Sequence, residues 1–208
     1  MTKRIIFIIK LLTIIGFIVA FSTCKKDPCL DLVKLEELRQ EMVSWYPDTT
    51  QTHFTIVDRN GISQSMNMHY YYHSSENTYS DDCGNNYGSF DLTLDYSMSV
   101  SPLGFTVNVR GSGNPFDGFY ISIKYFKGLG DWVSRTAEYD LTTDHSRSED
   151  VEINYIIGDS IYGDVLEIIF KNTTLPTEIE KIYFAKQFGI IRFSDKQGNE
   201  FVRTLIVH

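Results

Sequence analysis

The sequence is poor in cysteine, in basic residues and in paired catalytic groups. Its 208 residues include three cysteines, and 19 Lys and Arg stand against 27 Asp and Glu. The excess of negative charge argues against nucleic acid as a partner, because such binding rests on cations that meet phosphates. It also argues against electrostatic attachment to anionic lipid. No nucleophile stands with a companion base, so we expect a protein that is not an enzyme.

No apolar run reaches the length of about 20 residues that a transmembrane helix needs. Residues 1–23 instead begin with Lys3 and Arg4 and continue with a shorter apolar stretch that carries Lys10 near its middle. A basic start, a short apolar run and small residues before a cut are the layout of a signal peptide. Removing residues 1–23 takes away three of the 19 basic residues and leaves 16 against 27 acidic ones, a formal net charge of −11.

The end of this segment, Ser22-Thr23-Cys24, is similar to the lipobox of bacterial lipoproteins, whose cysteine becomes the lipidated first residue of the mature chain. That family prefers Leu three residues before the cysteine and Gly or Ala just before it, whereas this chain has Phe21 and Thr23. The alternative is an ordinary secretory signal with a coincidental cysteine. Each buried methylene of an acyl chain contributes about 0.8 kcal/mol, so two or three chains anchor a protein stably. We predict lipidation of Cys24.

The residues after the predicted anchor indicate where the protein is held. The residue after the cysteine is Lys25 rather than Asp, and in this the chain resembles lipoproteins that are sent to the outer membrane. The sequence leaves open whether the domain faces the periplasm or the outside. Residues 24–28 form a short tether, since the stretch from Cys24 to Cys29 spans at most about 18 Å of chain.

Cys29 and Cys83 are then the two cysteines free to pair, in an oxidising compartment. We predict a disulfide between them, which contributes about 3–5 kcal/mol if unstrained. The alternatives are two unpaired thiols, or one thiol used between chains. A catalytic thiol is disfavoured, because Asp81 and Asp82 beside Cys83 raise a thiol pKa.

Residues 29–208 have the length of one domain. A helix is predicted first, with Asp27 as its cap, Pro28 in its first turn and Pro47 as its end. Its apolar residues recur near helical spacing: Leu30, Val33, Leu38, Met42 and Trp45.

The rest of the chain reads as β structure. Strict alternation over "FDLTLDYSMSV" (90–100) and "FTVNVR" (105–110) predicts half-buried antiparallel strands. "DRNG" (58–61) predicts a turn between "HFTIV" and "ISQSMNMHYYY". Further strands are predicted at "FYISIKYF", "VEINYII", "VLEIIFK", "IEKIYFAK", "GIIRFSD" and "EFVRTLIV". About ten or eleven strands without alternating helices predict a mainly β protein, with an antiparallel curved sheet, sandwich or half-barrel.

The C-terminal stretches "INYIIGDSIYGDVLEIIF" and "IEKIYFAKQFGIIRFSDKQGNEFVRTL" resemble a family of uncharacterised Bacteroidota lipoproteins. That family shows a Gly-containing turn, Tyr-x-x-Val, and then a strand pair of the form Tyr-Tyr-Ala-Lys-x-x-Gly-Leu/Ile-Ile/Val. The matching residues are Tyr162, Val165, Tyr183, Phe184, Ala185, Lys186, Gly189, Ile190 and Ile191. The segment from "SWYP" to the Cys83 loop is similar to the first half of the same family. The resemblance implies a lipoprotein β fold and supplies no catalytic residue.

Several motifs are better explained by structure than by chemistry. Gly158-Asp159-Ser160 resembles the nucleophile block of GDS-type esterases, but it lies between two strands and only His208 follows it, so a hairpin turn is favoured. His69 and His73 share a strand face about 13 Å apart, too far to hold one metal ion. The acidic loop at 81–86 does not have calcium-loop spacing. We therefore predict no metal site and no cofactor.

Two groups of residues are candidate sites. Tyr70, Tyr71 and Tyr72 cannot all face inward in one strand, so at least one is a candidate for binding a glycan or a protein. An aromatic-rich core strand is the alternative. Thr49 and Ser160 follow aspartates, as in the Asp-Ser/Thr acceptor of Bacteroidota O-glycosylation, and are candidate glycosylation sites.

These observations favour a lipid-anchored protein of the cell envelope that binds rather than catalyses. Its partner is an apolar ligand held in a concave sheet, or a macromolecule held at the surface. An adhesin that binds glycans is the alternative, and a hydrolase ranks below both.

Overall fold

The computed structural model describes residues 39–80, 86–99, 101–111, 119–127, 133–159 and 161–204. A short helix at 39–44 comes first, and twelve strands follow. The strands are β1 (His53–Asp58), β2 (Ser63–Ser80), β3 (Asn86–Met98), β4 (Leu103–Gly111), β5 (Phe119–Lys127), β6 (Val133–Asp140), β7 (His145–Ser146), β8 (Val151–Asp159), β9 (Gly163–Phe170), β10 (Ile179–Ala185), β11 (Gly189–Asp195) and β12 (Glu200–Arg203).

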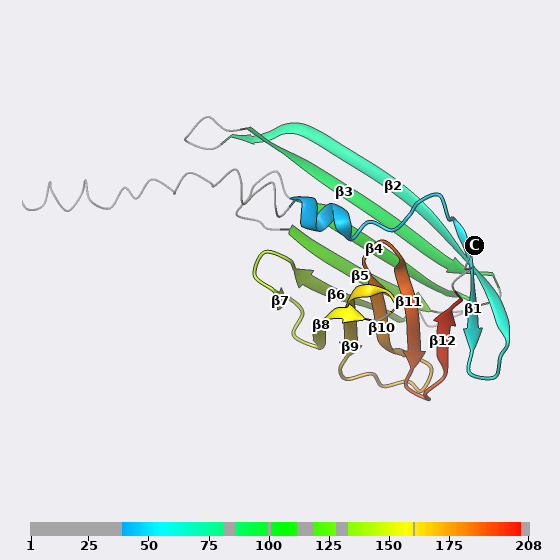
Figure 1. Cartoon of the computed structure of the whole chain (residues 1–208). Coiled ribbons are helices and arrows are strands. Elements are labelled where there is room, and N and C mark those ends of the chain that lie inside the picture. Colours follow the sequence, from blue (N-terminus) through cyan, green and yellow to red (C-terminus); the bar gives the residue numbers. More distant parts are fainter. Residues whose placement is uncertain are drawn as a thin grey trace, which may run out of the picture.

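All twelve strands belong to one antiparallel sheet in the order β7-β6-β5-β4-β3-β2-β1-β12-β11-β10-β9-β8. The sheet curls until it is nearly a closed barrel, with strands β2 to β5 on one side and strands β8 to β12 on the other (Figure 1). The expected mainly β class with an antiparallel curved sheet is therefore confirmed.

The two ends of the sheet, β7 and β8, meet at a seam. The Ser146 hydroxyl of β7 donates to the Val151 carbonyl of β8 at 3.4 Å. The chain crosses this seam in a few residues, so the first and last strands of the sheet order come together without a ladder between them.

The clearest alternating segments form the strands predicted for them. In β3 the side chains of Phe90, Leu92, Leu94, Tyr96 and Met98 are buried, and in β4 those of Phe105, Val107 and Val109. The DRNG turn joins β1 to β2: Gly61 has φ of +78°, and the Asp58 carboxylate accepts from the Asn60 and Ile62 N–H groups. Period-two alternation identified these strands because one face of each lies on the core.

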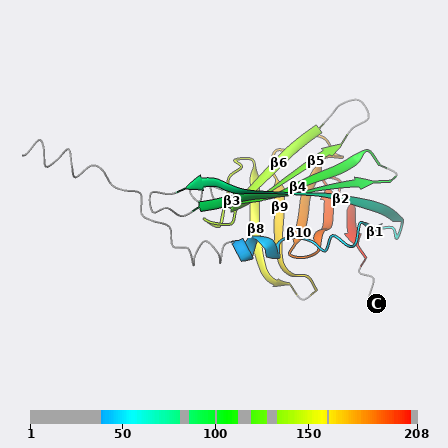
Figure 2. The same cartoon turned by 90° about the horizontal axis from the view of Figure 1, so that it is seen from above.

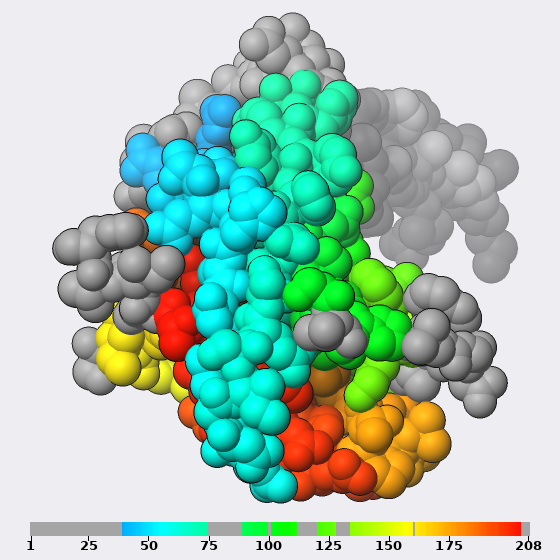
Figure 3. Space-filling view, turned by 90° about the vertical axis from the view of Figure 1, so that its right-hand side faces the viewer, coloured from blue at the N-terminus to red at the C-terminus, as the bar shows by residue number. Residues whose placement is uncertain are grey.

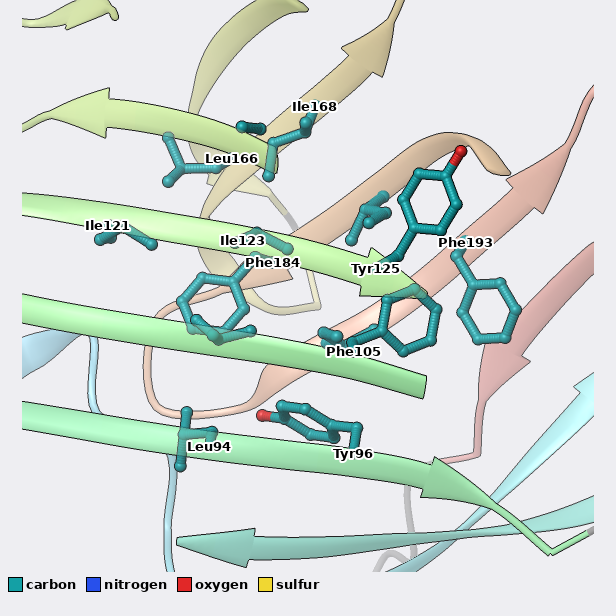
Figure 4. Packing of buried hydrophobic residues seen from close by; sticks show 14 of the residues in the cluster. Leu94, Tyr96, Phe105, Ile121, Ile123, Tyr125, Leu166, Ile168, Phe184 and Phe193 are labelled. Atoms are coloured by element: carbon teal, nitrogen blue, oxygen red, sulfur yellow. The ribbon is translucent and has the colours of Figure 1, made fainter. Parts of the chain in front are cut away.

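The core lies between the two sides of the sheet. Strands β8 to β10 run across β2 to β5 when seen from above (Figure 2). Side chains from both sides meet in the middle (Figure 4), with ring centroids 4.9 Å apart for Phe105 and Phe193 and 5.1 Å for Tyr125 and Phe170. The interior is thus occupied by aromatic and branched side chains that are almost fully buried.

The structure has strands that the sequence analysis did not identify. β6 and β7 were missed, because only Ala137 and Tyr139 of the β6 side chains with a described burial are buried apolar residues. The strand predicted to end at Tyr72 continues as β2 to Ser80, because β3 pairs with it over that length.

The predicted N-terminal helix is described from residue 39 onward, and its Met42 and Trp45 side chains are fully buried. No helix in the described part of the chain has the length and apolar character to span a membrane. Cys24, Cys29 and Cys83 lie outside the described residues, so the lipidation and the disulfide stay predictions.

Candidate functional site

The second half of β2 carries the tyrosines singled out by the sequence. Tyr70 lies opposite Leu94 of β3 and Tyr72 opposite Leu92, so both face the inner side of the sheet, whereas Tyr71 faces outward. The side chains of Tyr70, Tyr71 and Tyr72 are 46%, 64% and 56% exposed. We call Tyr70, Tyr71 and Tyr72 together the tyrosine surface.

The two inward-facing tyrosines are exposed because β1 stops short of them. The ladder between β1 and β2 runs from Val57–Ser63 to His53–Asn67, and the Met68 N–H still donates to the Thr52 carbonyl at 2.7 Å. Beyond Met68 no described residue pairs with β2 on that side.

The chain before β1 does not extend the β1–β2 ladder but contacts the turn between β10 and β11. The Asp48 N–H donates to the Gln187 carbonyl at 2.9 Å. Gly189, with φ of +76°, has no side chain, and a Cβ there would stand 3.4 Å from Pro47 Cβ and against the Tyr96 hydroxyl. Residues 47–51 therefore turn across the barrel end, and the chain after the helix runs beneath β2 and β3 in Figure 1.

Among the described residues, backbone groups of β2 beyond Met68 therefore have no neighbouring strand. In an antiparallel strand the N–H and C=O groups of alternate residues point to the same side. Since the Met68 N–H points to the β1 side, those of Tyr70 and Tyr72 point there too. We call these backbone groups of Tyr70 and Tyr72 the open edge. The later part of β2 stands beside the residues before β1 in the space-filling view (Figure 3).

The side of the open edge that faces the barrel is bounded by Tyr46. Its ring lies edge-on to Tyr72, with centroids 6.4 Å apart. Burial, and to a lesser degree the nearby Tyr72 and Asp91, raise the pKa of Tyr46 well above its ordinary value, so it stays a neutral hydroxyl. That hydroxyl oxygen is buried and finds no hydrogen-bond partner among the described residues.

The histidines of this region lie on the outer face. The Asn67 Oδ1 atom lies 2.6 Å from His53 Nδ1, while His69 and His73 lie opposite Asp95 and Asp91 of β3. Their common face confirms the predicted strand geometry. No group of three His, Cys, Asp or Glu side chains suited to a metal ion occurs in the part of the chain that the structure describes.

The esterase-like motif lies in a hairpin turn, as the sequence predicted. β8 and β9 pair as far as Asp159 and Gly163. The Asp159 carboxylate accepts from the Ile161 and Tyr162 N–H groups, and these hydrogen bonds hold the pKa of Asp159 below its ordinary value. Asp159 thus caps a turn. Ser160 and His208 lie outside the described residues.

Thr49, a candidate glycosylation site, is half-buried in the turn that precedes β1. Its neighbour Thr50 is exposed and donates both its N–H and its hydroxyl to the Asp48 carboxylate. Ser160, the other candidate, lies outside the described residues, so both sites stay predictions.

Sequence reasoning missed a partly buried ionic cluster that fastens the helix to the barrel. Lys186 Nζ lies 2.7 Å from Glu41 Oε1 and 2.8 Å from Asp164 Oδ2, and it stands 5.2 Å from the Trp45 ring centroid. Burial alone would lower the pKa of Lys186, but hydrogen bonds to Asp164 and Glu41 outweigh it and raise that pKa. Its partners are far apart in sequence, so no local pattern signals them.

The Lys186 cluster is structural. The Tyr155 hydroxyl also donates to the Asp164 carboxylate at 3.0 Å, and the Trp45 indole N–H donates to the Glu41 carboxylate at 3.3 Å. Each carboxylate that binds Lys186 thus has a second partner within the fold. The residues Tyr183, Phe184, Ala185 and Lys186 that carried the family resemblance lie on β10 and the start of its turn, where they build this anchor and the core.

Comparison of the chain with protein-family models, with curated proteins and with solved structures found no match.

Proposed function

We propose that this chain is a lipid-anchored protein of the cell envelope that acts by binding a macromolecular partner through its tyrosine surface. The observation that carries the proposal is the exposure of Tyr70, Tyr71 and Tyr72, three large rings in a row on a regular strand. Tyr70 and Tyr72 are neighbours on one face of the strand, and neighbouring exposed apolar groups on a folded domain are typical of interaction sites.

Tyrosine suits such a surface for physical reasons. Its ring supplies a large apolar area with few rotatable bonds, and its hydroxyl supplies a donor and an acceptor at the rim. Because Tyr70 and Tyr72 point to one face and Tyr71 to the other, the tyrosine surface offers rings on both sides of the strand.

The filled interior supports surface binding over transport of an apolar ligand. Carriers of such ligands hold a cavity of several hundred Å³. Here the rings of Phe105 and Phe193, and those of Tyr125 and Phe170, meet across the space between the two sides of the sheet. Large side chains in that position support packing rather than ligand storage as the role of the interior.

The anchor places this surface near a membrane. With lipid on Cys24 and a disulfide from Cys29 to Cys83, the tether of residues 24–28 holds the domain within about 18 Å of the bilayer. A partner bound by the tyrosine surface is then a component of the envelope or a molecule that reaches it. Lys25, which follows the predicted lipidated cysteine, supports the outer membrane as the site of attachment.

The first test is mass spectrometry of the protein purified from its native membrane, denatured and then native, with and without reductant. We expect a chain that starts at Cys24 with added acyl mass. Its mass should be two hydrogens short because of the Cys29–Cys83 disulfide, and reduction should restore these two hydrogens. A chain that starts elsewhere without acyl mass would remove the anchor. An apolar adduct that denaturation releases would replace surface binding with transport.

The tyrosine surface is tested by retention of envelope components. The triple variant Tyr70→Ser, Tyr71→Ser and Tyr72→Ser should lose at least 90% of whatever protein or glycan the wild-type protein retains, since each ring contributes roughly 1 kcal/mol or more at an interface. Ile62→Ser, which alters another exposed apolar side chain, is the matched control and should retain it. Equal loss in both would contradict the assignment.

A further inference from the structure

We propose that the open edge of β2 binds an extended, cationic segment of a partner polypeptide as an added antiparallel strand. This inference rests on the proposed function and names the kind of partner that the tyrosine surface takes. Its evidence is the geometry of the backbone, the composition of β2 and the charge around it.

The backbone geometry selects a polypeptide strand. Tyr70 and Tyr72 each present an N–H and a C=O group to the same side, about 6.6–6.8 Å apart along the strand. An extended chain repeats its own donors and acceptors at the same interval, so it meets both residues in one register. A glycan or a lipid has no such repeat of donors and acceptors.

The edge also lacks the features that usually block strand addition. Edges are commonly protected by Lys, Pro or bulges. From Met68 to Ser80 the chain has no Lys, Arg or Pro, and β2 pairs with β3 without a register shift from Met66 to Ser75. The first irregularity comes between Ser75 and Tyr79, beyond the open edge. The segment at Tyr70 and Tyr72 is thus a regular template.

The side chains beside the edge define what the added strand needs on each face. Tyr70 and Tyr72 line the inner side, with Tyr46 next to Tyr72, so inward residues of the added strand meet rings and should be apolar. Outward residues meet Tyr71 and the polar outer face.

Charge on the outer side favours basic residues there. The chain carries 27 acidic against 19 basic residues. Asp95, on β3 opposite His69, accepts the Thr106 hydroxyl and forms no ion pair with a described residue, whereas Asp91 is neutralised by Arg110 at 3.1 Å. No Lys or Arg occurs anywhere in β2. A partner strand with outward Lys or Arg therefore meets negative potential.

The test uses synthetic peptides of known register. The probe is an acetylated, amidated octapeptide of alternating valine and lysine, titrated into the acylated protein in neutral detergent, with detergent alone as blank. Directly opposite residues share a face, so inward valines form the hydrogen-bonded pairs with Tyr70 and Tyr72. N-methylation of the valines should weaken binding at least tenfold, and N-methylation of the lysines should not.

Two further comparisons complete the design. The alternating valine and glutamate peptide should bind at least tenfold more weakly than the lysine peptide, and equal binding would overturn the cationic assignment. Tyr72→Pro removes an N–H that faces only the open edge, which a strand tolerates. It should weaken binding of the lysine peptide at least tenfold while the unfolding midpoint stays unchanged. Ile62→Ser, which lies outside the tyrosine surface and the open edge, should leave binding unchanged.

The outcomes separate this inference from the proposed function. Peptide binding that survives both Tyr72→Pro and valine methylation would overturn strand addition. An envelope partner lost in Tyr70→Ser/Tyr72→Ser but kept in Tyr72→Pro would leave the tyrosine surface in place and overturn only the edge. A dimer that analytical ultracentrifugation detects and that Tyr72→Pro abolishes would assign the edge to a second copy of this chain. It would overturn the proposal that a cationic segment of a different protein binds there.

Discussion

The two halves of β2 share one neighbour and differ in the other. From Ser63 to Asn67 the strand pairs with β1, from Met66 it also pairs with β3, and its inward Met66 is fully buried. From His69 onward, β3 is its one partner strand among the described residues, and its inward Tyr70 and Tyr72 are exposed. The same alternation of side chains therefore makes core in one half and surface in the other, according to what covers the inner face.

The boundary between these halves is set outside β2. Residues 47–51 would continue alongside the strand if they stayed extended, but Asp48 bonds to Gln187 and Pro47 packs at Gly189. A turn on the far side of the barrel thus decides where β1 begins. The exposure of the tyrosine surface depends on this tertiary contact and not on the tyrosines themselves.

The largest expected loss of stability comes from truncating a buried side chain in the half of β2 that pairs with β1. Met66→Ala should lower the free energy of unfolding by about 2–5 kcal/mol, because a fully buried side chain leaves a cavity. Tyr70→Ala, at the matching face of the open half, should lower it by less than about 1 kcal/mol. Urea denaturation followed by circular dichroism measures both. Equal losses would mean that the open half is covered in solution.

The next effect concerns the contact that diverts the chain. Gly189→Ala should cost about 2–4 kcal/mol, since the new methyl group meets Tyr96 and Pro47 at a backbone conformation that disfavours a side chain. Gly61→Ala is the matched control, with φ of +78° but nothing within 4 Å, and should cost about 1–2 kcal/mol. Thermal unfolding of the two variants checks the difference, and a larger loss for Gly61→Ala would contradict it.

The smallest effect concerns the anchor of the helix before the diverted chain. The hydrogen bond from Lys186 lowers the pKa of Asp164 below its ordinary value near 4. A carboxyl with a lowered folded pKa contributes stability above its unfolded pKa and loses it as the pH falls through the folded value. We expect Asp164→Asn to cost about 1 kcal/mol at pH 7 and to reduce the loss of stability from pH 5 to pH 2.

The pKa of Lys186 shifts in the opposite direction to that of Asp164, so the pH range between the two supplies a control for that prediction. The pKa of Lys186 is raised, so its contribution is complete below its ordinary value of 10.5 and falls only above it. Between about pH 5 and pH 9 neither group titrates, and urea denaturation of the wild-type protein should show no change from this cluster. A change there that disappears in Asp164→Asn would contradict the assignment.

Strand prediction from the sequence succeeded where one face was apolar and the other polar. β3 and β4 were identified this way, and the turn residues Asp58 and Gly61 identified the first hairpin. β6 was missed because Arg135 interrupts the apolar face of its alternation. Arg135 is held there because it donates to the Lys171 and Asn172 carbonyls. Such long-range partners leave no periodic signal.

The candidate site was only half visible in the sequence. Alternation was enough to show that Tyr71 faces away from Tyr70 and Tyr72, and the register with β3 confirms it. It did not show that both inward tyrosines are exposed, because an inward aromatic residue is normally a core residue. Nor did it indicate Tyr46, which reaches Tyr72 from a segment 26 positions earlier in the chain.

The sequence by itself determined a mainly β chain, the alternation of its best strands and the turns that join them, because these follow from neighbouring residues. It also carries the predicted signal, lipid anchor and disulfide at Cys24, Cys29 and Cys83. Tertiary structure alone decided the closure of the sheet, the Lys186 anchor and the open edge of β2. Each of these depends on residues that meet only after distant segments pack, and no local pattern of the chain encodes which face is left uncovered.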